Sequence, residues 1–400
     1  MSISSISGGV GGVGGVGGVG GVGGVGGVGG VGGVGGVGGV GGVGGVGGVG
    51  GGAGSVTPSL AASLMTNRDG ISEAWDPLTR KPLPMASAHP DNIAEWSPWV
   101  RALILQTELL SHVGTFAAPS ADNVGLFHLA TTGGSATTVP SATYHALVDL
   151  TRPTDDDFVA QTEIVYNYAD LRPDRAGEIL NQVGFPTPFF GSIIGLHPAR
   201  NKYTIQLVSL AQLFASSVAM QAKNALAVWR PDIYSGQIQP MIPTPGHGAL
   251  PSAHATEAYI VSRLLLTLLD GKVETPDLER LLMAQATRIS VNRTVAGVHF
   301  PADTFAGAVL GATMGAYFCA RCGATNQTVK QATFNGAGIG STDFLQSDAF
   351  DGSQLKDFKS GSTDIIKVGA DITSNIGKSD LLGWLWDKAR AEWKTSWSDV

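Results

Sequence analysis

Three short motifs in the middle of the chain constrain its fold more than any other feature. They are Lys223-Asn-Ala-Leu-Ala-Val-Trp-Arg230-Pro231, Pro251-Ser252-Ala253-His254, and Asn292-Arg293 followed by His299 and Asp303. Lysine and arginine neutralise a tetrahedral oxyanion such as phosphate or vanadate, and arginine does so with a planar bidentate fork. Histidine adds a ligand or nucleophile and a group that moves a proton. A fold that uses all three motifs must bring them together around one anion.

The spacing within each motif resembles the pattern of the vanadium-dependent haloperoxidases and of the type 2 phosphatidic acid phosphatase/bacterial acid phosphatase superfamily. That pattern reads K-x6-R-P, then P-S-G-H, then S-R-x5-H-x3-D. The chain departs from it twice, because Ala253 replaces the Gly of the second block and Asn292 replaces the Ser of the third. Alanine keeps the backbone N–H that would approach an anion, but it is strained if the position needs a positive φ. Asn292 changes a neighbour of Arg293 and not a ligand of the pattern.

The resemblance implies a role for each motif residue. His299 would be the vanadium ligand of a haloperoxidase or the phosphorylated nucleophile of a phosphatase, and His254 would be the acid–base group. Asp303 would orient His299 through its second ring nitrogen. The oxyanion would be held by the side chains of Lys223, Arg230, Ser252 and Arg293 and by the backbone N–H of Ala253.

His247 is a further candidate catalytic residue, seven positions before His254. It lies where the resemblance places a histidine in bromoperoxidases and an aromatic residue in fungal chloroperoxidases. This position favours bromide or iodide as the halide. The alternative is a loop histidine beside glycines.

The resemblance favours an enzyme, a vanadium-dependent haloperoxidase with vanadate as its cofactor. Its partners would be hydrogen peroxide, a halide that is oxidised to hypohalous acid, and optionally a small organic acceptor. The long segment before Lys223 and the tryptophan Trp229 before Arg230 favour this assignment. One alternative is a phosphomonoesterase that forms a phosphohistidine at His299. The other is a binding or structural relative whose lost activity is marked by Ala253 and Asn292.

Helical periodicity dominates the remaining sequence, so we expect an all-α fold, a helical bundle of the vanadium haloperoxidase/acid phosphatase type with long loops. The predicted helices are 96–113, 203–223, 256–269, 276–291, 304–319 and 381–395. Residues 163–168 carry a strand signal, and residues 323–363 are predicted as loop or meander. The motif residues then lie at helix ends and in loops, where a bundle can build a site from several facing helices.

The N-terminal residues 8–54 are almost pure Gly-Gly-Val and contain 32 of the 58 glycines. Such a tract has too few side chains to offset the backbone entropy lost on folding, so residues 1–55 are predicted to be a disordered tail. A self-associating or tethering segment is the alternative. Residues 56–400 are predicted to form a single helical domain, with the active-site core at about 200–322.

Charge and hydropathy restrict the expected partners. The formal net charge is −7 with scattered basic residues, which argues against a nucleic-acid surface. No apolar run reaches 18 residues and the first residues lack a secretory signal, so we expect no membrane partner and favour a cytoplasmic location. A homo-oligomer is compatible with the sequence. The single Cys-Ala-Arg-Cys pair, Cys319 and Cys322, is too small a ligand set for zinc and is expected to be two thiols.

Overall fold

The computed structural model describes residues 58–72, 86–135, 137–272, 277–325 and 327–393. The chain divides into two units, Met1–Arg101 and Ala102–Val400. The first unit contains helix α4 (Pro58–Ile71), which buries no side chain, and the 3-10 helix η3 (Pro90–Glu95). Helix α5 (Pro98–Leu110) begins in this unit and ends in the second. The predicted tail, residues 1–55, lies outside the described residues.

Every predicted helix has a counterpart in the structure. Helices make up the larger part of the second unit. They are α6 (Asp155–Asn167), α7 (Arg172–Asn181), α8 (Thr187–Ile194), α9 (Lys202–Leu226), α10 (Pro231–Tyr234), α11 (Ala253–Leu269), α12 (Leu278–Val295), α13 (Pro301–Arg321), α14 (Gln346–Ala349) and α15 (Asp380–Ala391), with the 3-10 helices η4 (Tyr168–Leu171) and η5 (Thr373–Asn375). Helix α13 begins earlier than predicted, because Pro301 occupies its first position, where a missing N–H costs nothing.

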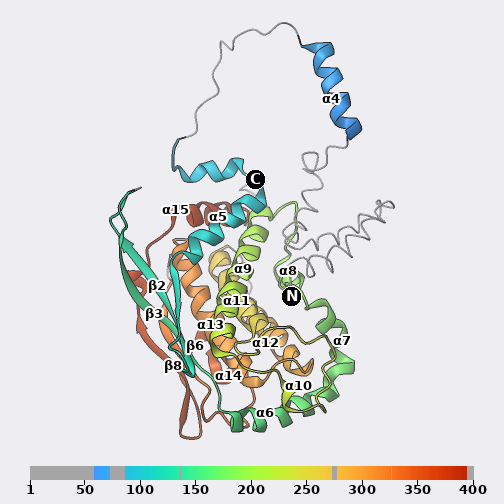
Figure 1. The fold of residues 1–400 in the computed structure, drawn as a ribbon, viewed down its shortest axis with the longest axis vertical. Helices are drawn as coiled ribbons and strands as arrows, with labels where there is room; N and C mark the ends of the chain where they lie inside the picture. The colour runs from blue at the N-terminus through green and yellow to red at the C-terminus, as the bar shows by residue number, and fades with distance from the viewer. Residues whose placement is uncertain (1–57, 73–85, 136, 273–276, 326, 394–400) are drawn as a thin grey trace. The chain divides into compact units, whose positions relative to one another are not determined.

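A mixed six-stranded sheet lies on one side of helices α9, α11 and α13 (Figure 1). Its order is β1-β2-β3-β4-β8-β7, formed by β1 (Val113–Phe116), β2 (Asn123–Thr132), β3 (Ser141–Thr151), β4 (Lys330–Asn335), β7 (Phe358–Ser360) and β8 (Thr363–Asp371). Strands β5 (Phe350–Asp351) and β6 (Gln354–Leu355) form a second, small sheet. Strands β3 and β4 are parallel and the other neighbours are antiparallel. Since parallel neighbours need a crossover connection, helices α6 to α13 together form that connection.

This sheet makes the fold mixed α/β, so the predicted all-α class is wrong. The buried positions of β2 are Val124, Leu126 and His128. A histidine at an inward position interrupts the apolar alternation that would predict a strand. The segment 323–363, predicted as loop or meander, holds β4 to β7 and the short helix α14.

The strand predicted at residues 163–168 is also wrong, because these residues end α6 and begin η4. Thr154 caps α6: its hydroxyl accepts from the N–H of Asp157, and the Asp157 carboxylate accepts from the N–H of Thr154. This capping box fixes the start of the helix. It outweighs the strand preference of the β-branched and aromatic residues that follow.

Helix α13 packs closely against α11 through glycines spaced four residues apart. A Cβ at Gly307 would lie 2.6 Å from the carbonyl oxygen of Ser252, and one at Gly311 would lie 2.6 Å from that of Thr256. The absence of side chains permits this approach. The N–H of Ser252 donates to the carbonyl of Asp303 at 2.8 Å. The close packing therefore brings the second motif against the third.

Within the described residues, one helical segment, Lys202–Tyr234, is long and apolar enough to cross a membrane, and 56% of the segment's most apolar window is buried in the protein. The core helix of a soluble protein meets the same criterion. Both cysteines are buried free thiols at the end of α13. Burial raises the pKa of Cys319 to about 11.

Candidate oxyanion site

The three motifs meet where helices α9 to α13 begin or end. Lys223 lies in the last turn of α9, Arg230 precedes α10, Ser252 and His254 lie at the start of α11, Arg293 is in the last turn of α12, and His299 and Asp303 are at the start of α13. Four charged or titratable groups act on His299 electrostatically, namely Arg230, Lys223, His254 and Arg293. The fold thus gathers the motif residues around one imidazole, and we call this group the cage.

Two turns set the spacing of the cage residues. Helix α9 ends at Ala227, whose φ of 48° and ψ of 47° are left-handed and redirect the chain toward Arg230. The turn from α12 to α13 passes through Gly297, with φ +82°. A Cβ at Gly297 would lie 2.7 Å from Arg172 Nη2 and 3.2 Å from the backbone of Pro240. Glycine is therefore required between Arg293 and His299.

His299 is held between an acidic and a basic side chain. Its Nδ1 lies 2.9 Å from Asp303 Oδ2, and its Nε2 lies 2.9 Å from Arg230 Nη1. Because a carboxylate accepts and a guanidinium donates, the ring proton resides on Nδ1 and the lone pair on Nε2. Burial and then the charge of Arg230 lower the pKa of His299 well below its ordinary value. His299 is therefore a neutral imidazole, the form that a ligand or a nucleophile requires.

The cations of the cage are buried. Lys223, Arg230 and Arg293 are 2%, 4% and 1% exposed. Lys223 Nζ donates to the carbonyls of Gly248 and Ala249 at 2.9 and 2.7 Å. Burial lowers the pKa of Lys223 well below its ordinary value and that of Arg293 to about 10. A bound anion would offset this concentration of buried positive charge.

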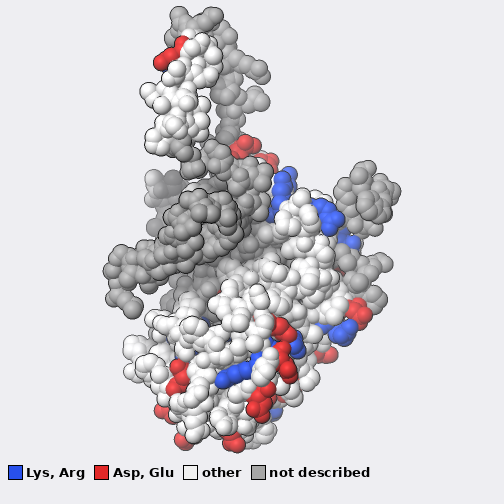
Figure 2. All heavy atoms as spheres, turned by 90° about the vertical axis from the view of Figure 1, so that its right-hand side faces the viewer, with Lys and Arg blue, Asp and Glu red and all other residues white. Residues whose placement is uncertain are grey.

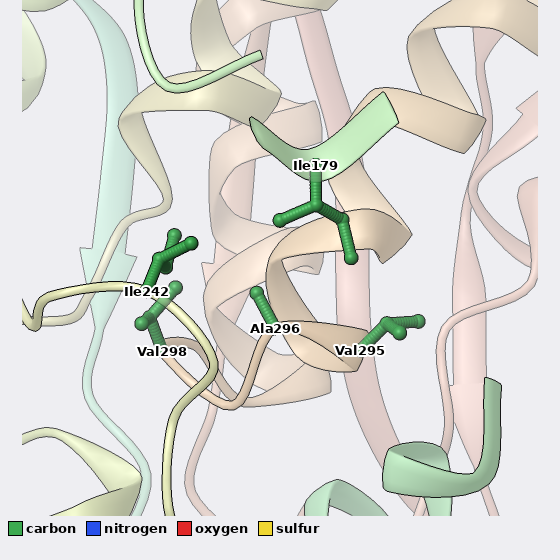
Figure 3. Close-up of a cluster of buried hydrophobic side chains, with 5 residues drawn as sticks. All are labelled: Ile179, Ile242, Val295, Ala296 and Val298. Atoms are coloured by element: carbon green, nitrogen blue, oxygen red, sulfur yellow. The ribbon is translucent and has the colours of Figure 1, made fainter. Parts of the chain in front are cut away.

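Figure 3 shows a cluster of buried apolar side chains, two of whose members contact the arginines of the cage through their backbone carbonyls. It consists of Ile179, Ile242, Val295, Ala296 and Val298. Arg230 Nη1 donates to the carbonyl of Val298 at 2.6 Å, and Arg293 Nη2 donates to that of Ile179 at 3.4 Å. Because these carbonyls belong to packed residues, the core itself fixes the guanidinium groups.

Helix α11 contributes its first turn to the cage. His254 Nε2 donates to the carbonyl of Gln182 at 2.8 Å, and burial followed by the charge of Arg293 lowers the pKa of His254 to about 3. Ala253 is the first residue of α11 and is not among the described residues with positive φ. The backbone strain that alanine would have at a position of positive φ is therefore absent here. Its N–H lies at a helix N-terminus, where anions bind. The Ser252 hydroxyl accepts from Ala255 N–H at 3.4 Å and keeps its own hydrogen for another partner.

His247 lies beside Arg230, one of the cage residues. Its carbonyl accepts from Arg230 Nε at 3.1 Å, and its ring Nδ1 lies 3.1 Å from Arg230 Nη2. The side chain is exposed, and Trp229, which precedes the same arginine in the sequence, is 67% exposed. His247 and Trp229 therefore lie on the solvent side of the cage.

Two buried carboxyl groups accompany the cations. Asp303 Oδ2 also accepts from the N–H of Phe300 at 2.9 Å, and burial raises the pKa of Asp303. Glu257 was not predicted as a site residue, although it is the one acidic residue of α11, one turn after His254. It is 5% exposed, and burial raises its pKa to about 8 against the opposing charges of Lys223 and Arg293.

Gln182 is the second residue beside the cage that was not predicted from the sequence. It follows α7, lies outside all three motifs and is fully buried. Its carbonyl accepts from His254, and its side-chain Oε1 accepts from Arg293 Nη2 at 3.2 Å. Only the folded chain brings this residue to the cage.

The face of the molecule in Figure 2 shows basic and acidic side chains interspersed, without a broad area of one sign. The positive charge of the cage is thus concentrated inside the protein. Among the described residues, no group of three or more His, Cys, Asp and Glu side chains is arranged to hold a metal ion.

Residues 203–327 match the family model of the PAP2 superfamily. The matched segment runs from α9 to the residues after α13 and contains all three motifs. The match supports the phosphatase/haloperoxidase superfamily and is compatible with either activity. No curated protein matches the chain.

Proposed function

From the match to the PAP2 superfamily, we propose that the chain is an enzyme that binds vanadate and oxidises a halide with hydrogen peroxide. The observation that carries the anion-binding part of this proposal is the state of His299. It is a neutral imidazole whose Nε2 lone pair faces a buried arginine and whose Nδ1 is held by Asp303. Asp303 fixes the tautomer, as a carboxylate hydrogen-bonded to the other ring nitrogen does for metal-bound histidines.

The residues of the cage fit vanadate, a tetrahedral oxyanion with the geometry of phosphate. Lys223, Arg230 and Arg293 would hold its oxygens together with the Ser252 hydroxyl and the Ala253 N–H, and His299 Nε2 would be the ligand. Arg293 Nε is buried and has no hydrogen-bond partner among the described residues, so it can take an oxygen. When bound, vanadate supplies a Lewis acid that activates peroxide.

The protein's own groups bind the anion and move protons. Arg230 Nη1 donates to His299 Nε2 in the structure, and this donor would be available to an oxygen of the anion if Nε2 were the ligand. The charges of Arg293 and Lys223 help to lower the pKa of His254. With these charges offset by an anion, the pKa of His254 would rise, and His254 would then be able to take up a proton from peroxide and return it to the product.

His247 supports bromide or iodide as the substrate of this proposed enzyme. It lies on the solvent side of the cage beside Arg230, where a halide would approach a cation and an imidazole. A small organic acceptor would meet the hypohalous acid after its release. The proposal involves neither nucleic acid nor membrane.

A phosphomonoesterase is the second candidate, because the PAP2 match and the neutral His299 suit it equally. Nε2 would attack phosphorus, and His254 would protonate the leaving oxygen. An inactive relative is less well supported. Ala253 has no positive φ, and Asn292 makes side-chain hydrogen bonds to Arg175, Glu178 and Gln182, so neither departure removes a cage residue.

One pair of assays tests the proposal. The full chain, stripped of anions and reconstituted with orthovanadate, is assayed with peroxide and chloride, bromide or iodide, and the vanadate-free protein is assayed with a phosphate ester. We expect vanadate-dependent oxidation of bromide and iodide. Ester hydrolysis without halide oxidation would establish the phosphatase instead. Neither activity, with the anion still bound, would indicate a binding relative.

A further inference from the structure

We infer that Gln182 is a positioning residue that connects the anion-binding Arg293 to the acid–base residue His254. The inference rests on the proposed oxyanion site and adds a residue that lies outside its sequence motifs. Gln182 follows the last residue of α7, and its side chain is fully buried.

The contacts of Gln182 reach two cage residues through different atoms. The main-chain carbonyl accepts from His254 Nε2 at 2.8 Å. The side-chain Oε1 accepts from Arg293 Nη2 at 3.2 Å and from Asn292 Nδ2 at 3.0 Å. A side-chain substitution therefore removes the support of Arg293 while leaving the carbonyl that holds His254.

The orientation of the Gln182 amide is fixed by a chain of polar contacts from the surface. Asn292 Nδ2 also donates to Glu178 Oε2 at 3.1 Å, and its Oδ1 accepts from Arg175 at 3.1 Å. Glu178 in turn pairs with Arg288 at 2.6 Å. An asparagine at position 292 has both the donors and the acceptor that this chain of contacts uses, whereas a serine has a single hydroxyl. The departure from the family pattern thus belongs to the support of Arg293.

The pairing leaves part of Arg293 available. Both protein acceptors, Ile179 and Gln182, bind Nη2. Arg293 Nε and Gln182 Nε2 are buried and have no hydrogen-bond partner in the described part of the chain. Gln182 therefore fixes the guanidinium through one nitrogen and keeps another for an anion.

A double-mutant cycle tests this role through the affinity of the vanadate-free full chain for orthovanadate, measured by titration calorimetry. We expect Gln182→Ala to weaken binding about tenfold, as for the loss of a hydrogen bond to a charged group. In the Arg293→Ala background the same change should have no further effect, because Gln182 acts through Arg293. Gln182→Met, which keeps the volume, serves if the alanine variant does not fold.

Gln212 provides the matched control. It is a buried glutamine of α9 with one side-chain partner, Thr187, and its Nε2 is also unpartnered among the described residues. Gln212→Ala should lower stability without changing orthovanadate affinity. Unchanged affinity in folded Gln182 variants, or an equal loss in the Arg293→Ala background, would overturn the inference alone. A wild-type chain that binds neither orthovanadate nor phosphate would overturn the proposed function and this inference together.

Discussion

Two regions of the molecule bury a histidine, and they do so with different partners. His299 in the helical cage and His128 in strand β2 of the sheet are 3% and 1% exposed. Burial is the largest cause of a lowered pKa in both. His128 Nδ1 lies 3.2 Å from the Tyr317 hydroxyl. Its ring stacks with those of His112 and His145, at distances of 6.2 and 6.4 Å between ring centroids. His299 instead lies between a carboxylate and a guanidinium.

The contrast shows that burial alone does not mark a functional histidine. A histidine among rings and a hydroxyl is part of the packing of the sheet. A histidine whose tautomer is fixed by Asp303 and whose lone pair faces a cation is prepared to bind an electrophilic centre.

The largest effect is expected for His299→Ala. If the proposed function holds, the variant should lose peroxidase turnover by on the order of 10⁴-fold or more, as when a covalent or ligating group is removed, and should lose tight vanadate binding. The fold should persist, because one imidazole at the cage is a small part of the core. Turnover assays, vanadate titration and thermal unfolding followed by circular dichroism measure the three quantities.

His128→Ala is the matched control for this prediction. It removes an equally buried histidine from the sheet, so it should lower the melting temperature and leave vanadate affinity in place. If His128→Ala abolished vanadate binding in a folded protein, or His299→Ala retained it, the distinction between the two regions would be wrong.

His254→Ala should have the next largest effect. Loss of the proton-transfer group should lower turnover by about 10²–10⁴-fold, while vanadate is still bound through His299 and the cations. Turnover and vanadate affinity are each measured for His254→Ala and for His299→Ala, and the losses in the two variants are compared. Equal losses of affinity in the two variants would show that His254 acts as a ligand.

The same contrast explains what the sequence could predict. The helices of the cage carry long apolar periodicity, and the motif spacing places Lys223, Arg230 and His299 at their ends. Local patterns were therefore sufficient to predict these helices and the positions of the motif residues along them. The sheet was missed because inward positions of its strands carry His128 in β2 and Ala332 in β4, which interrupt the alternation of large apolar residues. Gln182 and Glu257 were missed because their roles depend on which helices pack together. No local pattern contains that information.

A pH effect on stability is expected from the sheet histidine. Burial lowers the pKa of His128 from 6.5 to about 4, and the charge of Arg321 adds to the effect. Between these values the unfolded chain binds a proton that the folded chain does not, so the free energy of unfolding falls as the pH falls. The pKa difference corresponds to at most about 3 kcal/mol.

His128→Gln removes this titration, so its stability should depend less on pH between pH 7 and pH 4 than that of the wild type. Denaturant unfolding at several pH values measures the difference. Tyr317, His145, Arg321 and His112 face the substituted position and remain unchanged. Identical pH dependence of the two proteins would show that His128 does not titrate as its burial implies.

The smallest effect is expected at the turn that carries the cage, where Ala227 adopts a left-handed conformation. This conformation costs a residue with a Cβ about 1 kcal/mol, and glycine adopts it freely. Ala227 is exposed, so its methyl group contributes little to packing. Ala227→Gly should therefore raise the free energy of unfolding by about 0.5–1 kcal/mol and leave vanadate affinity unchanged.

Ala225→Gly, two residues earlier and inside helix α9, should lower stability by a similar amount, because glycine is unfavourable in a helix. A loss of stability in both variants would mean that Ala227 is not strained, and that the turn between Lys223 and Arg230 is formed without a conformational cost.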